Sequence, residues 1–303
     1  MLNICFSPQY FAKTHTNSME KLVAVAEQLQ RLDAQKYASE KHHDFKFHEP
    51  DPIDPDILRA LHAPRYVDAF LTGEPKKLAT FAGFKPWNEN LRDAVLSIQG
   101  GQLLATELAF KHGISANIAQ GFHHAHYEYG GSYCTFNGLA LIAQHYPNKR
   151  IFVLDCDQHG GDGTADFTRR LDNLYNFSIY GLAFGYPISE RAESRHVHIK
   201  NGGFAQYLMA LHEAFQKAEE WQADIIIYQA GMDCHQADPY GSAWFSTEFI
   251  QKREEVVFSM AKKAGIPLMF VLAGGYQNLD DLVKLHVSTF QIAHQVYYGE
   301  NKL

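Results

Sequence analysis

Cysteine is scarce in this sequence, with four residues among 303. None of the four stands in a Cys-x-x-Cys pair, so their spacing gives no indication of a zinc site built from thiolates. The first ten residues also lack the charged-then-apolar layout of a secretory signal peptide. Reduced thiols without an export signal predict a cytoplasmic setting.

Long apolar runs and basic clusters are missing as well. No apolar stretch is long enough to cross a bilayer, so we expect no membrane span. The net charge is −7 and no run of Lys or Arg forms a basic face, so direct binding to nucleic acid is not expected. Hydrophobic residues make up 46% of the chain and charged residues 20%, which excludes a disordered chain and allows a sizeable core.

Apolar runs alternate with helical patterns along most of the chain. We predict strands over residues 2–6, 114–118, 151–154, 174–180, 224–228 and 267–272. We predict helices over 20–32, 90–112, 139–146, 165–171, 204–221, 247–264 and 279–298, two short helices within 55–71, and a loop over 42–55. This alternation predicts one α/β domain over residues 1–303, with three layers, α/β/α, and a central, mostly parallel sheet.

Polar or glycine-rich segments follow four of the predicted strands. These segments are His123-His124, Asp155 to Gly163, Gln229 to Asp233, and Ala273 to Tyr276. In open parallel sheets, ligands bind beyond the carboxyl ends of the strands. Four such segments at one edge of a sheet predict one active site.

Asp157, His159 and Asp233 could together hold a divalent metal. On an extended chain Asp155 and Asp157 face one side and Cys156 the other. Three protein ligands with one open position are the catalytic zinc arrangement, and Fe²⁺ or Mn²⁺ also accepts such ligands. Taken alone, Asp157 is better read as a helix cap and His159 as a partner of a loop carbonyl; the three residues together favour the metal.

His123, His124 and Tyr276 are candidates for the chemistry beside that metal. Asp155 and Asp162 remain as carboxylates that could each orient one imidazole. A histidine so placed could take a proton from water and pass one to a leaving amine. The hydroxyl of Tyr276, after two glycines, could donate a hydrogen bond to a developing oxyanion. Without these companions, Tyr276 would read as a core tyrosine after a tight turn.

These motifs and their order resemble the zinc-dependent histone deacetylase family, which has the arginase–deacetylase fold. The resemblance runs from about Ser7 to the final helix. The sequence is more similar to the class IV branch than to the other branches of the family at Gln158 and in segments 120–124, 253–258 and 273–277. The family's two-metal relative, arginase, needs carboxylates at the positions of Gly161 and His235, so one metal is expected here.

The resemblance implies a role for each candidate residue. Zn²⁺ would be bound by Asp157, His159 and Asp233. His124, with Asp162 behind it, would be the general base and acid, and His123, with Asp155 behind it, its electrostatic partner; Tyr276 would polarise the scissile carbonyl. A structural K⁺ would lie at Asp155, Asp157, His159 and Ser178, and the substrate would be contacted by Gly131, Tyr133, Tyr186 and Gly275.

The implied activity is removal of acyl groups, acetyl or longer fatty acyl, from the lysine side chains of a peptide or protein. An alternative substrate is a small acetylated amine such as an acetylpolyamine, and a third hypothesis is a non-catalytic binder of acylated partners. Ser132, Tyr133 and Gly160 depart from the residues usual in the family, which bears on acyl preference. The sequence gives no indication of the oligomeric state.

Overall fold

The computed structural model describes residues 1–16, 18–37, 43–182, 189–197, 203–241 and 245–299. Within these ranges eight strands form one sheet in the order β2-β1-β3-β8-β7-β4-β5-β6, and every neighbouring pair is parallel. The strands are β1 (Leu2–Cys5), β2 (Phe45–His48), β3 (Ile114–Gln120), β4 (Ile151–Asp155), β5 (Leu174–Tyr180), β6 (Ala192–His196), β7 (Ile225–Ala230) and β8 (Leu268–Leu272).

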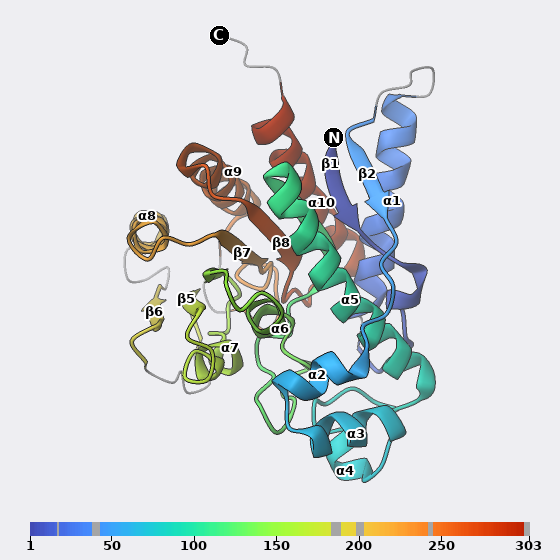
Figure 1. Cartoon of the computed structure of the whole chain (residues 1–303). Coiled ribbons are helices and arrows are strands. Elements are labelled where there is room, and N and C mark those ends of the chain that lie inside the picture. Colours follow the sequence, from blue (N-terminus) through green and yellow to red (C-terminus); the bar gives the residue numbers. More distant parts are fainter. Residues whose placement is uncertain (17, 38–42, 183–188, 198–202, 242–244, 300–303) are drawn as a thin grey trace.

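Helices cover both faces of this sheet (Figure 1). They are α1 (Glu20–Lys36), α2 (Pro55–Leu61), α3 (Pro64–Thr72), α4 (Lys76–Ala79), α5 (Glu89–His112), α6 (Gly138–His145), α7 (Asp162–Phe167), α8 (Gly203–Glu220), α9 (Thr247–Ala264) and α10 (Leu279–Tyr298). One layer runs α5–α6–α7 and the other α8–α9–α10–α1, each helix in contact with the next. The three-layer α/β/α prediction is therefore confirmed. No helix in the described ranges is long and apolar enough to span a bilayer.

The long helices begin and end at residues suited to those positions. The side chain of Asn88 accepts a hydrogen bond from the Leu91 amide at the start of α5, and that of Ser246 does the same for Phe249 in α9. The two helices end at Gly113 and Gly265, whose positive φ angles of 82° and 67° suit residues without a Cβ.

Two edge strands were missed by the sequence prediction. Residues 45–48 form β2, although 42–55 was predicted to be a loop, and β6 was not predicted at all. β2 has the sequence Phe-Lys-Phe-His and β6 the sequence Ala-Glu-Ser-Arg-His, and both pair on one side only. Short, polar edge strands lack the apolar run that identifies a strand buried on both faces.

The predicted helix 165–171 was also misplaced, because α7 spans Asp162–Phe167. Asp162 occupies the first turn, where a carboxylate is favoured by the helix dipole. β3 and β7 run two residues further than predicted, to Gln120 and Ala230. These shifts carry the ends of the strands closer to the predicted site residues.

Register aligns the carboxyl ends of the four central strands. Leu272 of β8 lies beside Gln120 on one side and Ala230 on the other. Asp155 at the end of β4 lies beside Gln229 of β7 and Ser178 of β5. The polar segments that follow these strands therefore start at the same edge of the sheet, as the sequence predicted.

An ion pair is buried behind this edge. The Arg253 guanidinium lies 2.5 Å from a Glu254 carboxylate oxygen, and both side chains are 0% exposed. Arg253 also donates to the Cys156 carbonyl and to the Cys234 sulfur, at 3.3 and 3.4 Å. Tyr228 donates its hydroxyl to the same Glu254 carboxylate. One charge pair thus connects α9 to the two loops that carry the predicted metal ligands.

We expect Glu254→Gln to lower the free energy of unfolding by about 3 kcal/mol, because it leaves the Arg253 charge buried without its counterion. Glu255→Gln is the matched control. Glu255 pairs with Lys252 at 2.8 Å, but these side chains are about half exposed, and such pairs contribute less than about 1 kcal/mol. Urea denaturation at pH 7 measures both; equal losses would show that burial of the pair does not decide its effect.

Candidate metal centre and active site

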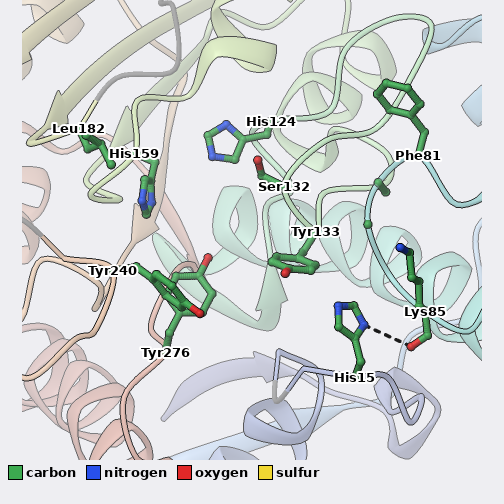
Figure 2. Close-up of a pocket in the computed structure, with 12 residues that line it drawn as sticks. His15, Phe81, Lys85, His124, Ser132, Tyr133, His159, Leu182, Tyr240 and Tyr276 are labelled. Atoms are coloured by element: carbon green, nitrogen blue, oxygen red, sulfur yellow. Dashed lines mark hydrogen bonds between the residues drawn. The ribbon is translucent and has the colours of Figure 1, made fainter.

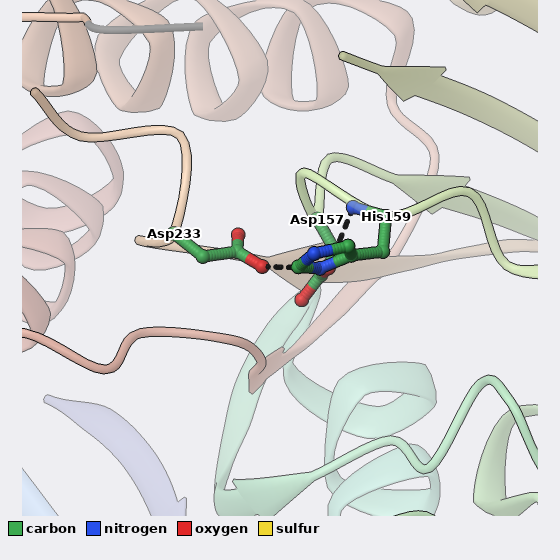
Figure 3. A group of neighbouring side chains, drawn as sticks. All are labelled: Asp157, His159 and Asp233. Carbon is green, nitrogen blue, oxygen red and sulfur yellow. Dashed lines mark hydrogen bonds and ion pairs between the residues drawn. The ribbon is translucent and has the colours of Figure 1, made fainter. Parts of the chain in front are cut away.

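Asp157, His159 and Asp233 lie together just beyond the ends of β4 and β7 (Figure 3). One potential ligand atom from each lies within 4.8 Å of the others, and all three residues are buried. His159 Nδ1 lies 3.0 Å from Asp233 Oδ2 and 3.3 Å from Asp157 Oδ1. Two carboxylates and an imidazole at these separations form a donor set suited to a divalent cation.

The electrostatics of the three residues also fit a cation. Burial and the neighbouring Asp157 carboxylate raise the pKa of Asp233 to about 7. Burial lowers the pKa of His159, but hydrogen bonds and charge from the two carboxylates outweigh it and raise that pKa to about 10. The Asp157 carboxylate makes ionisation of Asp233 unfavourable, which indicates that the site has an excess of negative charge. A divalent cation would neutralise that excess.

Backbone amides hold the two carboxylates in place. The Gly274 amide donates to Asp157 Oδ2 at 2.6 Å, and the Gln158 amide donates to Asp233 Oδ1 at 2.9 Å. Gly274 must approach closely to do this. A Cβ at position 274 would lie 2.2 Å from Asp233 Oδ2 and 2.7 Å from Asp157 Oδ2. Only glycine leaves room for these carboxylates.

His123 and His124 form two separate pairs with aspartates. His123 Nδ1 lies 2.8 Å from Asp155 Oδ2, and His124 Nδ1 lies 2.5 Å from Asp162 Oδ1. The two imidazole rings are 3.9 Å apart at their centroids. The preceding Phe122 has a φ of 58°, which is uncommon outside glycine and turns the chain so that consecutive histidines share one site.

The environments of the two histidines shift their pKa values in opposite directions. Burial lowers the pKa of His123, but the charges of Asp155 and Asp157 outweigh it and raise that pKa to about 9. Burial and the charge of His123 lower the pKa of His124, despite its hydrogen bond to Asp162. One imidazole is therefore suited to carry a charge at neutral pH and the other to act as a base.

Tyr276 points into the same space as His124 and His159 (Figure 2). Its backbone amide donates to Asp238 Oδ2 at 2.7 Å, and its ring packs edge-on against Tyr240 at 5.3 Å. Burial and the charges of Asp157 and Asp233 raise the pKa of Tyr276 well above its usual value. The phenol therefore keeps its proton and remains a hydrogen-bond donor.

A pocket of about 610 Å³ connects these side chains to solvent. His124, His159 and Tyr276 contribute to it together with His15, Phe81, Ala82, Gly83, Lys85, Ser132, Tyr133, Leu182 and Tyr240 (Figure 2). Of the predicted substrate-contacting residues, Tyr133 therefore lines the pocket. Gly131 and Gly275 are not among the lining residues, although they belong to the loops that carry Tyr133 and Tyr276. Tyr186 lies outside the described residues.

Asp155 and Ser178 of the predicted monovalent-cation set lie side by side on β4 and β5. The Ser178 hydroxyl accepts from the Gly161 amide at 3.3 Å and from the Asn176 side chain at 3.2 Å. Asp155 uses one oxygen for His123 and the other for the Asp157 amide. The structure therefore brings this set together around the turn that holds the metal ligands.

Sequence reasoning missed two titratable residues near the site. Lys21 is buried, and its ammonium donates to the Ala273 carbonyl, just before Gly274. Burial lowers the pKa of Lys21 to about 8, although Asp157 and Asp233 oppose the shift. His126 contacts Asp162. The available signals were weak: Lys21 lies four residues before Val25 on an apolar helix face, and His126 lies two residues after His124.

Comparison with known proteins agrees with this geometry. The histone deacetylase domain model matches residues 15–290. An uncharacterized protein of Picosynechococcus sp. is 30% identical over 82% of this chain and 85% of its own length. Histone deacetylase 2 of Arabidopsis thaliana is 33% identical over 58% of this chain, and acetylpolyamine amidohydrolase 2 of Pseudomonas aeruginosa is 31% identical over 51%. The match spans 48% of each of these two named proteins.

Solved structures show the same fold. The crystal structure of the HDA15 HD domain superimposes with a TM-score of 0.76 at 17% identity, covering 98% of this chain and 90% of that chain. The eight-stranded sheet and its helical layers are therefore shared with that domain.

We expect Gly274→Ala to abolish stable binding of a divalent metal, because the added methyl group collides with both carboxylates. Ala273→Gly is a control in the same loop, since it removes a methyl group instead of adding one. Elemental analysis after dialysis measures the metal retained per chain. Equal metal content in Gly274→Ala and the parent protein would contradict the assignment of Asp157, His159 and Asp233 as ligands.

Proposed function

Because the chain belongs to the histone deacetylase domain family, we propose that it is a metal-dependent hydrolase that removes acyl groups from lysine side chains. The observation that carries this proposal is the meeting, in one pocket, of the Asp157–His159–Asp233 set, two histidine–aspartate pairs and Tyr276. The acyl C–N bond breaks, water supplies OH to the acyl carbon, and the proton goes to the leaving amine.

Asp157, His159 and Asp233 would hold Zn²⁺, or alternatively Fe²⁺. A divalent ion bound there supplies Lewis-acid polarisation of the amide carbonyl and makes water easier to deprotonate. The sequence motifs that resemble class IV, such as Gln120 to His124, accord with this assignment. A structural K⁺ at Asp155, Asp157, His159 and Ser178 would stiffen the turn beneath it.

His124 is the general base in this proposal and then the general acid. Its lowered pKa leaves it neutral at pH 7, so it can accept a proton from the attacking water and deliver it to the lysine amine. Asp162 holds its other nitrogen and fixes the tautomer. His123, with its raised pKa, contributes a positive charge beside it, and Asp155 orients that ring.

Tyr276 stabilises the developing oxyanion. Its phenol is protonated at neutral pH and points into the pocket next to His124 and His159 (Figure 2). The hydrogen bond that the Tyr276 amide donates to the Asp238 carboxylate fixes the loop after Gly275. A preorganised donor of this kind contributes more to the transition state than to the ground state.

We expect Tyr276→Phe to reduce kcat on an acyl-lysine peptide about 10²- to 10³-fold and His124→Ala about 10²- to 10⁴-fold. Tyr240→Phe is the matched control: Tyr240 packs against Tyr276 but is 65% exposed, so its loss should change kcat less than about threefold. The assay is a panel of acetyl-, octanoyl- and myristoyl-lysine peptides, each repeated with a zinc chelator. Near-parental turnover in either site variant would contradict the assigned roles.

The second candidate substrate is an acetylated polyamine, since a relative is named for that activity. The pocket mouth argues for acyl-lysine instead. The exposed residues Lys85 and His15 lie at the mouth, and the described lining residues include no carboxylate (Figure 2). A polyamine carries additional positive charges, which a cationic rim repels.

We expect Lys85→Glu to raise kcat/KM for an acetylpolyamine roughly fivefold relative to an acetyl-lysine peptide, with the gain diminished in 0.5 M salt. Lys111→Glu makes the same charge change in the last turn of α5, away from the pocket, and should leave the ratio unchanged. If the unsubstituted protein already has a higher kcat/KM for the acetylpolyamine than for every acyl-lysine peptide, the acetylpolyamine is the better assignment of substrate.

A cytoplasmic setting also belongs to this proposal. All four cysteines are buried and unpaired, as expected for a reducing compartment. The expected partner is an acylated protein or peptide.

A further inference from the structure

Asp162 holds two imidazoles at once. Its Oδ1 lies 2.5 Å from His124 Nδ1, and its Oδ2 lies 3.3 Å from His126 Nε2. Asp162 therefore contacts His124 through one carboxylate oxygen and His126 through the other. By contrast, the second oxygen of Asp155 accepts a hydrogen bond from the backbone amide of Asp157. The two histidine–aspartate pairs of the site are thus built differently.

A second carboxylate continues the chain of contacts outward. Asp166 lies one turn after Asp162 on α7, and its Oδ2 is 3.6 Å from His126 Nδ1. Residues four apart on a helix share a face, so α7 presents both carboxylates to one ring. Side-chain exposure rises along the series, from 7% at His124 through 15% at Asp162 and 19% at His126 to 31% at Asp166.

His126 is also fixed from the other sides. Its amide donates to the Tyr129 carbonyl, its carbonyl accepts from His62 Nδ1 at 2.9 Å, and its ring stacks on Tyr129 at 5.0 Å. The titratable groups that contact it in the described structure include Asp162, Asp166, Tyr129 and His62. Burial lowers the pKa of His126, but Asp162 and Asp166 outweigh burial and raise it.

We propose that His126 is a positioning residue of the catalytic centre, which holds the outer oxygen of Asp162 so that the inner oxygen stays aligned with His124. This inference rests on the proposed function, since it concerns the alignment of the proposed general base. When it is protonated, His126 also offsets part of the Asp162 charge. Without that offset, the carboxylate would stabilise a protonated His124 more strongly.

Two substitutions separate the parts of this role. His126→Phe keeps a ring against Tyr129 but removes the donor and the charge; His126→Gln keeps a donor without the charge. We expect His126→Phe to lower kcat about tenfold or more with KM unchanged, and His126→Gln to recover most of that loss. In both variants the acidic limb of the kcat/KM profile should move about 0.5–1 pH unit higher, because the Asp162 charge is no longer offset.

His43→Gln is the matched control. His43 pairs with Asp33 at 2.7 Å near the far edge of the sheet, so its loss should move neither kcat nor the acidic limb. Parental kcat in His126→Phe, equal losses in the Phe and Gln variants, or an acidic limb at the parental pH in both would each overturn the inference.

One measurement does not depend on turnover. Histidine-selective NMR titration of the metal-loaded protein should give His126 a pKa above its usual value, lowered by Asp162→Asn. A His126 pKa that is unchanged in Asp162→Asn overturns the inference, even if the parent protein cleaves no acyl-lysine. Absence of turnover with a coupled His126 would instead count against the proposed function alone.

Discussion

Four aspartates gathered at one edge of the sheet govern the surrounding structure. The side chains of Asp155, Asp157 and Asp233 are 0–3% exposed, and that of Asp162 is 15% exposed. Removing carboxylates from water costs several kcal/mol each unless they are paired. The cationic and donor groups around them follow from this cost: four imidazoles, backbone amides and the buried Lys21.

The cost of burying these charges also gives His123 and His124 opposite shifts in pKa. Asp155 is fully buried, and its charge together with that of Asp157 keeps His123 protonated. Burial and the charge of His123 instead lower the pKa of His124, although its hydrogen bond to Asp162 opposes the shift. Neighbouring groups driven to opposite protonation states can act as a base and an electrostatic partner. The two histidines are adjacent in sequence, so the difference arises from the charges around each ring: two aspartates beside His123, and the His123 charge beside His124.

The sequence predicted the central strands and the site because both depend on local patterns. An apolar run followed by a polar turn identifies a strand buried on both faces and the candidate ligands that follow it, as at Ile151 to His159. Edge strands β2 and β6 lack that run, so they were missed. His126 and Lys21 were missed because their importance lies in partners 36 and 252 residues away in sequence. No local pattern contains such pairings.

Two glycines limit what the four aspartates can bind. A Cβ at position 161 would lie 2.3 Å from Asp155 Oδ2, the oxygen that contacts His123. A carboxylate at 161, which a second metal of the arginase kind would need, therefore cannot coexist with the Asp155–His123 pair in this geometry. At 274 the absence of a side chain leaves the Asp157 and Asp233 oxygens open to one shared ion. The close contact at Gly161 therefore accords with the proposed site, in which one metal lies beside two histidine–aspartate pairs.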